Sequence, residues 1–274
     1  MQACGIITLT TDFGLEDEYV GLLKGVMLCR EPKLRLVDLC HALPPGDIAA
    51  AARLLRASWL FFPPGTVHLA VVDPGVGGSR KILALTVGEQ FFVGPDNGIF
   101  SPWFNNTPPP QVRRVANTRL FLPRISATFH GRDIMAPVAA ALAGGLPLAE
   151  TGPALAPEEC VRLALSQAQR VKDCLCGIIV ARDHFGNLLS DICHEELAEL
   201  AGDTNALLQV EVAGSAPLRL VRCYDEASVG ETIALVGSRG VLEIAVNRSN
   251  AARSLGVDVG AAVTVRRRAP SPSR

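Results

Sequence analysis

An aspartate, a glycine-rich turn and an arginine follow an apolar segment in the first half of the chain. Residues 71–80 read VVDPGVGGSR, so Asp73 and Arg80 lie seven residues apart with three glycines between them. In open α/β sheets, ligands bind at the carboxyl ends of strands, and glycines there let backbone N–H groups approach a ligand closely. This pattern predicts a place for chemistry, although it also suits a tight turn that needs only positive φ.

Similar polar clusters follow other apolar segments. Their sequences are TDFG at 11–14, GPDNG at 94–98, TFHGRD at 128–133, DHFGN at 183–187 and SRG at 238–240. Each also has a structural explanation: Asp12 and Asp133 are suited to capping helices, and Asp96-Asn97-Gly98 is an ordinary turn sequence. Their joint occurrence next to strands favours a functional site over a set of unrelated turns.

Three histidines of the first half differ in their surroundings. His130 is flanked by Phe129 and Gly131 near the start of a predicted helix, where an imidazole can accept or donate a proton near neutral pH. His41 and His68 lie in or beside apolar strands, and we expect them to be packed rather than catalytic. His130 is therefore the catalytic candidate.

Known motifs fit the glycine-rich segment incompletely. It comes close to the D-x-G-x-G-x-G signature of methyltransferases that use S-adenosyl-L-methionine (SAM), but that signature and the Rossmann G-x-G-x-x-G need a helix next. Here Arg80 runs straight into a predicted strand, and no P-loop sequence is present. A phosphohydrolase with Asp12, Asp73 and Asp133 as metal ligands remains open, yet the histidines lack ligand spacing. Cys174 and Cys176 have no second pair, and we expect no metal.

The elements around these clusters alternate at first and then change. Predicted strands at 6–10, 34–39, 67–72, 82–87 and 90–93 alternate with helices at 16–30, 48–60 and 132–143. This pattern predicts an α/β/α domain with a largely parallel sheet over residues 1–150. A linker rich in Pro, Gly and Ala is expected at 151–170, a smaller β-barrel-like domain at 171–265, and a disordered tail at 266–274.

Composition limits the classes of protein. The chain has 274 residues and a formal net charge of −1, with a pI near 6.5, which argues against binding to nucleic acid or a membrane surface. Its richest apolar stretch is interrupted by Arg53 and Arg56, so no membrane span is expected. The first strand begins near residue 6, leaving no room for a cleavable signal, and the eight cysteines are expected to be reduced thiols. We expect a cytoplasmic protein.

The motifs together resemble one family. TDFG with Asp17, Tyr19, Val20 and Gly21, then VVDPGVG with Arg80, GPDNG, TFHGRD, DHFGN and the late segment 238–251 occur in the order typical of the SAM hydrolases, also called SAM hydroxide adenosyltransferases. These enzymes are relatives of the fluorinating and chlorinating enzymes. The resemblance runs from Thr10 to about Val257 and implies that water attacks C5′ of the ribose of SAM, releasing adenosine and L-methionine. SAM is then a substrate, and no cofactor is implied.

The resemblance also implies roles for individual residues. The water-activating set falls on Asp73, Arg80 and His130. Substrate-binding residues fall on Asp12 for the ribose hydroxyls, Asp183 for the methionine ammonium, Ser238 and Arg239 for its carboxylate, Phe185 and Asn187 for adenine, with Glu243 and the backbone near Val246 as weaker assignments. The family forms homotrimers, in which each pocket lies between the first domain of one subunit and the second domain of its neighbour.

Two departures from the family pattern leave alternatives. Gly237-Ser238-Arg239-Gly240 stands where Asn-Ser-x-Gly is expected, and Ser249-Asn250-Ala251 where Gly-Asn-Ala is expected. Arg239 resembles the halogenating branch at that position, but halogenating relatives have tyrosine in place of Asp73. We therefore favour hydrolysis over formation of a 5′-halo-5′-deoxyadenosine. A non-catalytic module that binds SAM or adenosine is the third possibility, against which the presence of Arg80 and His130 argues.

Overall fold

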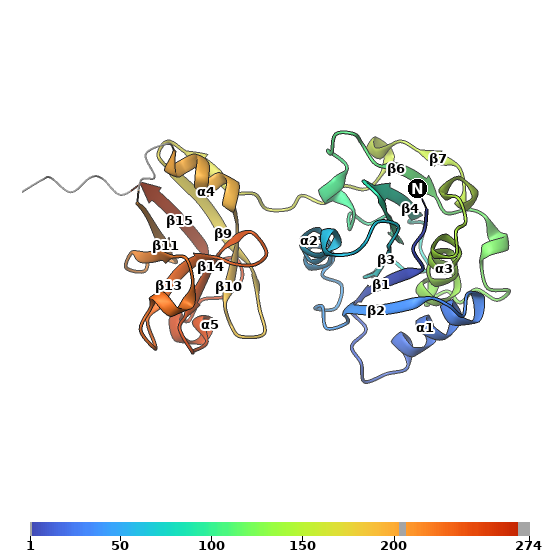
Figure 1. Cartoon of the computed structure of the whole chain (residues 1–274), viewed down its shortest axis with the longest axis horizontal. Coiled ribbons are helices and arrows are strands. Elements are labelled where there is room, and N and C mark those ends of the chain that lie inside the picture. Colours follow the sequence, from blue (N-terminus) through green and yellow to red (C-terminus); the bar gives the residue numbers. More distant parts are fainter. Residues whose placement is uncertain (1, 203–206, 268–274) are drawn as a thin grey trace, which may run out of the picture. The chain divides into compact units, whose positions relative to one another are not determined.

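The computed structural model describes residues 2–202 and 207–267 of the chain. Contacts between residues gather into two compact units, Met1–Ala164 and Leu165–Arg274, which Figure 1 colours from blue to yellow and from yellow to red. The start of the predicted linker belongs to the first unit, because β7 (Ala154–Leu155) pairs with β6 (Gln111–Arg114). The Val161 amide also donates to Asp96 Oδ1 over 2.8 Å.

The first unit contains a seven-stranded sheet in the order β2-β1-β3-β5-β4-β6-β7. Its remaining strands are β1 (Ile6–Thr11), β2 (Arg35–Cys40), β3 (Val67–Val71), β4 (Ile82–Val87) and β5 (Gln90–Pro95). Strands β2, β1, β3 and β5 are parallel, whereas β4, β6 and β7 are antiparallel to their neighbours. The β4–β5 connection at Gly88 and Glu89 is too short for a parallel crossover, so it must form a hairpin. The predicted α/β fold is confirmed, with a mixed sheet.

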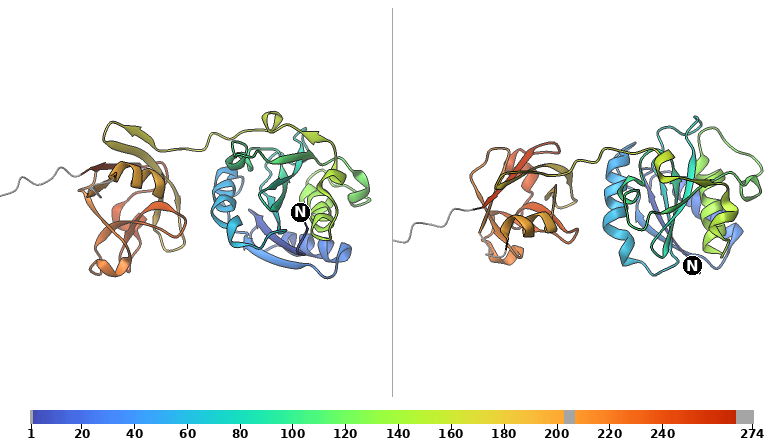
Figure 2. Two further views of the ribbon diagram at one scale, coloured as in Figure 1. Left: turned by 45° about the horizontal axis from the view of Figure 1, so that its top comes forward. Right: turned by 90° about the horizontal axis from the view of Figure 1, so that it is seen from above.

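Helices cover both faces of this sheet (Figure 2). Helices α1 (Tyr19–Arg30) and α3 (Ala136–Ala143) pack on one face, where Leu23, Met27 and the α3 alanines join Ile7 and Leu9 in one core cluster. Helix α2 (Ile48–Ser58) packs on the other, and the predicted cap Asp47 accepts the Ala50 amide over 2.7 Å.

Helix α1 begins later than predicted. Its first residue is Tyr19, so Asp17 and Glu18 precede the first turn instead of lying in it, and Glu18 makes no capping bond through its side chain. In the predicted 132–143 helix, the first part is a π-helical turn, Gly131–Met135, that leads into α3.

The second unit is a closed barrel of seven strands, which confirms the predicted β-barrel-like fold. Its strands are β9 (Cys174–Arg182), β10 (Leu188–Cys193), β11 (Leu208–Val212), β12 (Leu218–Val221), β13 (Thr232–Val236), β14 (Val241–Val246) and β15 (Ala262–Arg267). The barrel closes because β10 pairs with both β14 and β9. Strand β8 (Gln169–Val171) adds to the side of β9, while helices α4 (His194–Ala201) and α5 (Ala251–Leu255) contribute apolar side chains to the barrel core.

The end of the chain departs from the predicted tail at its first two residues. Arg266 and Arg267 belong to β15 and pair with Gln209 and Leu208 of β11. The rest of that tail, 268–274, lies outside the described residues. Within the described parts of the chain, no helix combines the length and the apolar character that crossing a membrane requires.

Candidate active site

Asp73, Arg80 and His130 come together at the end of β3. Arg80 Nε donates to Asp73 Oδ1 and Oδ2, each over 2.9 Å, and Arg80 Nη2 donates to Oδ2 over 2.5 Å. The same Nη2 lies 3.0 Å from Nδ1 of His130, which immediately precedes the π-helical turn. Side chains fifty residues apart in sequence therefore form one continuous group.

Two contacts fix the backbone on either side of Asp73. Gly77 has a φ of +80°, and a Cβ placed there would lie 2.3 Å from the Ala127 carbonyl oxygen. Only glycine allows this close approach, which brings the 73–80 loop against the segment that leads to His130. From the other side, Asn97 Nδ2 donates to the Val72 carbonyl over 2.8 Å. The GPDNG motif thus supports the Asp73 loop from within the first unit.

The ion pair is almost removed from water. The side chains of Asp73 and Arg80 are 5% and 12% exposed, so their attraction is screened less than that of a surface pair. Burial lowers the pKa of His130 below its usual value, and the positive charge of Arg80 lowers it further, against smaller raising effects of Asp73 and Asp133. Burial and the charge of Arg80 therefore favour the neutral form of this imidazole.

The hydrogen bonds determine which nitrogen of neutral His130 carries its hydrogen. A guanidinium can only donate, so His130 Nδ1 accepts from Arg80 and the hydrogen of the neutral ring resides on Nε2. His130 therefore offers an N–H donor on the side away from Arg80. The lone pair at Nδ1 is already engaged, which leaves Asp73 as the member of the group with free acceptor capacity.

A pocket of about 230 Å³ opens onto this group. It is lined by Asp12, Phe13, Gly46, Val71, Asp73, Pro74, Val76, Thr128, Phe129, His130 and Gly131. Asp73 and His130 belong to the lining whereas Arg80 does not, so the guanidinium binds both residues from behind the pocket wall. A larger hollow of about 390 Å³ in the same unit has Arg113 as the one charged residue among its lining residues.

Asp12 forms part of the same wall. Its Oδ2 accepts the Gly46 amide over 2.8 Å, and neighbouring Phe13 packs against Phe129 with ring centroids 5.8 Å apart. By contrast, the other aspartate considered as a metal ligand, Asp133, is fully buried and engaged by Arg132 and the Ser126 amide. Within residues 2–202 and 207–267, His, Cys, Asp and Glu side chains form no group of three suited to a metal ion.

The predicted residues of the second unit gather at the β9–β10 and β13–β14 turns. Asp183 accepts the backbone and side-chain N–H groups of Asn187 over 2.8 and 3.0 Å. Phe185, in the same turn, has 73% of its surface exposed, a large apolar area left open to solvent. Ser238 and Arg239 are exposed between β13 and β14. These positions leave the side chains of Phe185, Ser238 and Arg239 accessible to a ligand.

Glu243 and Val246 lie along β14 behind these turns. Glu243 is 7% exposed, and its Oε1 accepts the hydroxyl of Tyr224 over 2.5 Å. Burial raises the pKa of Glu243, and the nearby negative charge of Asp183 raises it further. Val246 is buried, and its carbonyl accepts the Ser249 amide over 2.9 Å. Tyr224 lies outside all the sequence motifs of the predicted site, so no local pattern indicates its contact with Glu243.

Comparison with known proteins covers both units. A family model described as the SAM hydroxide adenosyltransferase N-terminal domain matches residues 7–152, and one described as the C-terminal domain of the same family matches residues 177–264. Over 259 residues the chain is 40% identical to the (R)-S-adenosyl-L-methionine hydrolase of Thermus thermophilus, covering 91% of this chain and 95% of that protein.

Other relatives extend this comparison. The hydrolase of the same name from Salinispora arenicola is 38% identical, over 93% of this chain and 95% of that protein. A fluorinase from Actinoplanes sp. is 29% identical, over 95% and 97%. A crystal structure of an uncharacterized conserved protein from Thermotoga maritima superposes with a TM-score of 0.89 at 34% identity, covering 95% of this chain and all of that one.

Proposed function

The chain belongs to the SAM hydroxide adenosyltransferase family, and we propose that it is a SAM hydrolase that forms adenosine and L-methionine. The observation that carries this proposal is the Asp73–Arg80–His130 group, bonded through Arg80 and facing the pocket with a carboxylate and an imidazole. The relatives named (R)-S-adenosyl-L-methionine hydrolase at 38–40% identity, against 29% for the fluorinase, support hydrolysis over halogenation.

The reaction requires little acid catalysis because its leaving group is good. A water oxygen forms a bond to C5′ while the C5′–S bond breaks, and the bonding pair moves to sulfur and neutralises the sulfonium. L-Methionine leaves as a neutral thioether. The main task of the site is to orient one water in line with the C5′–S bond, and such positioning is worth up to roughly 7–11 kcal/mol of the barrier.

We assign Asp73 as the acceptor of the water proton. His130 Nε2–H can donate to the water oxygen, which directs a water hydrogen toward the carboxylate. Arg80 fixes the carboxylate of Asp73 by hydrogen bonds and keeps His130 Nδ1 occupied. General-base assistance of this kind typically contributes about 10²–10⁴-fold in rate. A carboxylate at this place would repel chloride or fluoride, which is a further reason to favour water as the nucleophile.

Chromatography of SAM after incubation with the purified protein tests this function. The wild type should produce adenosine and methionine in equal amounts, and His130→Ala should lose most of the turnover. His194→Ala, which removes an exposed histidine of the second unit, is the matched control and should stay active. Formation of 5′-chloro-5′-deoxyadenosine with added chloride would indicate a halogenase, and tight adenosine binding without turnover would indicate a binding module.

We further propose that the active enzyme is a homotrimer in which Asp183, Phe185, Asn187, Ser238, Arg239, Glu243 and Val246 of one subunit complete the SAM site of another. The presence of ligand-like clusters in both units supports this arrangement. Mixing two inactive variants, Asp73→Asn and Asp183→Ala, should restore part of the activity, because exchange of subunits creates sites that carry neither substitution. Light scattering should give three chains per particle; an active monomer would contradict the proposal.

We also propose that the protein is cytoplasmic, that SAM is its substrate and that it needs no cofactor. All eight cysteines are free thiols, as is typical of a reducing compartment. Fractionation of cells that produce the tagged protein tests the location.

A further inference from the structure

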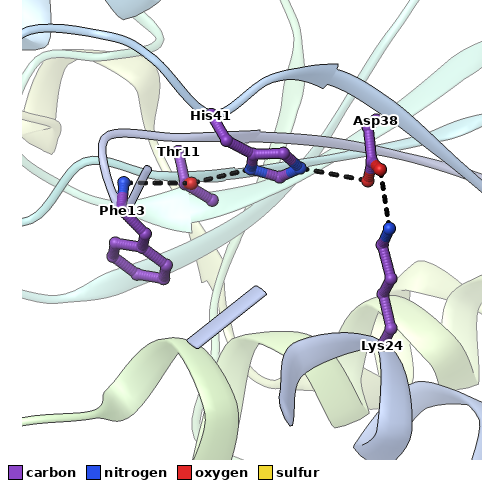
Figure 3. A network of polar contacts seen from close by, with 5 residues as sticks. All are labelled: Thr11, Phe13, Lys24, Asp38 and His41. Carbon is purple, nitrogen blue, oxygen red and sulfur yellow. Dashed lines mark hydrogen bonds and ion pairs between the residues drawn. The ribbon is translucent and has the colours of Figure 1, made fainter. Parts of the chain in front are cut away.

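A chain of polar contacts links Lys24, Asp38, His41, Thr11 and Phe13 (Figure 3). It begins at partly exposed Lys24 and Asp38 and ends at Phe13, which lines the pocket. Lys24 Nζ donates to Asp38 Oδ2 over 2.6 Å, and Asp38 Oδ1 lies 3.0 Å from His41 Nε2. His41 Nδ1 lies 2.8 Å from Thr11 Oγ1, which in turn accepts the Phe13 amide over 3.3 Å. The chain thus links helix α1, strand β2 and the end of strand β1.

The directions of these hydrogen bonds form one consistent set. The Phe13 amide donates to one lone pair of Thr11 Oγ1, and the Thr11 hydroxyl can donate to His41 Nδ1. His41 Nε2–H then donates to Asp38, so every polar atom of the ring has a partner. Thr11 is fully buried and His41 is 5% exposed, so losing either partner would leave an unpaired buried group.

The same residues join the two segments that form the Asp12 side of the pocket. The His41 carbonyl accepts the Gly14 amide over 2.7 Å, and the Gly46 amide donates to Asp12 Oδ2 over 2.8 Å. Two hydrogen bonds therefore connect segments 11–14 and 41–46: one is accepted by the His41 carbonyl and the other by the Asp12 side chain. Asp12, Phe13 and Gly46 all line the pocket.

We infer that His41 is a positioning residue: held by Asp38, it fixes Thr11 and thereby the orientation of Asp12 toward the ribose hydroxyls of the substrate. This inference rests on the proposed function and on the ribose-binding role that the family resemblance implies for Asp12. His41 does not contact the reacting atoms. The ribose hydroxyls do not take part in the bond changes, so they should be bound equally in the ground and transition states. Loss of the His41 hydrogen bonds should therefore raise KM and leave kcat almost unchanged.

The chain supplies a matched control for this inference. Thr8, three residues earlier on β1, makes the same kind of contact, with its Oγ1 2.8 Å from Nδ1 of fully buried His68. Neither Thr8 nor His68 lines the pocket. Thr8 and Thr11 are both fully buried on β1, and each contacts a buried histidine of another segment. Thr8→Val and Thr11→Val each remove one hydroxyl from such a pair, so they separate a loss of stability from a loss of positioning.

Steady-state kinetics with SAM provide the first test. His41→Gln and Thr11→Val should each raise KM about tenfold, the equivalent of one buried hydrogen bond, with kcat within about twofold of the wild type. Thr11→Ser, which keeps the hydroxyl, should restore most of the affinity. Thr8→Val should lower the melting temperature without changing KM. Equal KM values for Thr11→Val and Thr8→Val would overturn the inference.

The ratio of the affinities for two nucleosides distinguishes positioning from a merely structural role, which would not change this ratio. Calorimetry should show that adenosine binds the wild type more tightly than 2′,3′-dideoxyadenosine, which lacks both ribose hydroxyls. In His41→Gln and Thr11→Val this ratio should fall toward one, because only the hydroxyl contacts are lost. An equal weakening of both nucleosides would show general damage to the pocket and would overturn the inference.

The result also separates this inference from the function on which it rests. A wild type that does not consume SAM contradicts the proposed function. A wild type that consumes SAM, together with a Thr11→Val variant that melts as a folded protein and keeps the full nucleoside ratio, contradicts only the role of His41. If His41→Gln does not fold, Thr11→Val alone decides the question, since valine closely matches threonine in shape.

Discussion

Two polar networks, one on strand β3 and one just beyond its end, differ in their access to a ligand. His68, the second residue of the strand, is fully buried: its Nδ1 lies 2.8 Å from Thr8 Oγ1, its Nε2 contacts Gln90 Oε1, and its ring stacks on Phe92 at 4.8 Å. Asp73, five residues further along, meets Arg80 and His130 at the wall of a pocket. The first network pairs both nitrogens of its imidazole within the sheet, whereas the second leaves hydrogen-bonding groups open to a ligand.

The difference shows how burial within the sheet or a place at the wall of a pocket decides what an imidazole can do. Within the sheet, both nitrogens of His68 are engaged by neutral partners, and burial lowers its pKa to about 4, so it stays neutral and links β1, β3 and β5. Beyond the strand end, the backbone turns away and leaves room for a ligand. There His130 pairs with a charged group and keeps one donor free. The first network joins strands within the sheet, and the second lies where a ligand can reach it.

The largest effect is expected for Asp73→Asn, which keeps the size of the side chain and removes its negative charge. The asparagine amide cannot accept the water proton, so kcat should fall on the order of 10³-fold. Chromatographic measurement of SAM consumption gives the rate. Asp173→Asn, at an exposed position of the second unit, is the control and should retain full activity. A kcat within tenfold of the wild type would remove Asp73 from the role of base.

Gly77→Ala is expected to reduce activity by displacing the backbone of the Asp73 loop, without changing any side chain of the proposed catalytic group. The added Cβ would meet the Ala127 oxygen at 2.3 Å and must separate the Asp73 loop from the His130 segment. A displacement near 1 Å can cost about 10²-fold in rate. Gly145→Ala is a matched control, because Gly145 also has positive φ but would place its Cβ in open space. Equal losses in the two variants would show that backbone strain, and not the Ala127 contact, is responsible.

His68 should govern how stability responds to acid. Its folded pKa, about 4, lies below the value of 6.5 expected when unfolded, so its contribution is complete above pH 6.5 and is lost as the pH falls toward 4. The loss should approach roughly 3 kcal/mol near pH 4. Urea unfolding at several pH values measures it. His68→Phe should be less stable at pH 7 but respond less steeply between pH 6.5 and 4; an unchanged slope would contradict this prediction.

The smallest expected effect is on the titration of His130. Arg80 lowers the pKa of this imidazole, so Arg80→Ala should raise it, the more so because Asp73 would then act without its partner. Two-dimensional NMR of the histidine ring protons reports the pKa directly, without requiring activity. His194, which is exposed and distant in sequence, provides the internal reference. An unchanged pKa for His130 in this variant would show that burial alone controls it and would contradict the prediction.

Much of the fold follows from local patterns. The alternating apolar segments predicted β1 to β5, and the Asp47 cap predicted the start of α2. Strands β6 and β7 were not predicted. Strand β6, QVRR, is short and polar, and β7 has only the two residues Ala154–Leu155, so neither shows the alternation of a strand. Strand β6 pairs with β4 and β7 pairs with β6, so both depend on a sheet edge that other segments provide, which is a tertiary property.

Sequence patterns separate polar residues of the candidate site from packed ones only in part. Asp73 and His130 were recognised by type and context, and His68 was correctly predicted to be packed. His41 was likewise predicted to be packed, and it is buried, but its contacts with Thr11 and Asp38 reach the pocket edge, which nothing in its neighbours in sequence indicates. Tyr224 was missed because its partner, Glu243, lies nineteen residues away on another element.

The sequence by itself determined the residue types, their order and the elements that separate them, because periodicity, caps and turns act over a few residues. It thereby limited the chemistry to a carboxylate, a guanidinium and an imidazole. Only the tertiary structure decided that Arg80 contacts both of the other groups, that Gly77 closes against Ala127 and that His41 reaches Thr11. These contacts join distant segments, and their geometry is fixed by packing of the whole sheet and its helices rather than by any local preference.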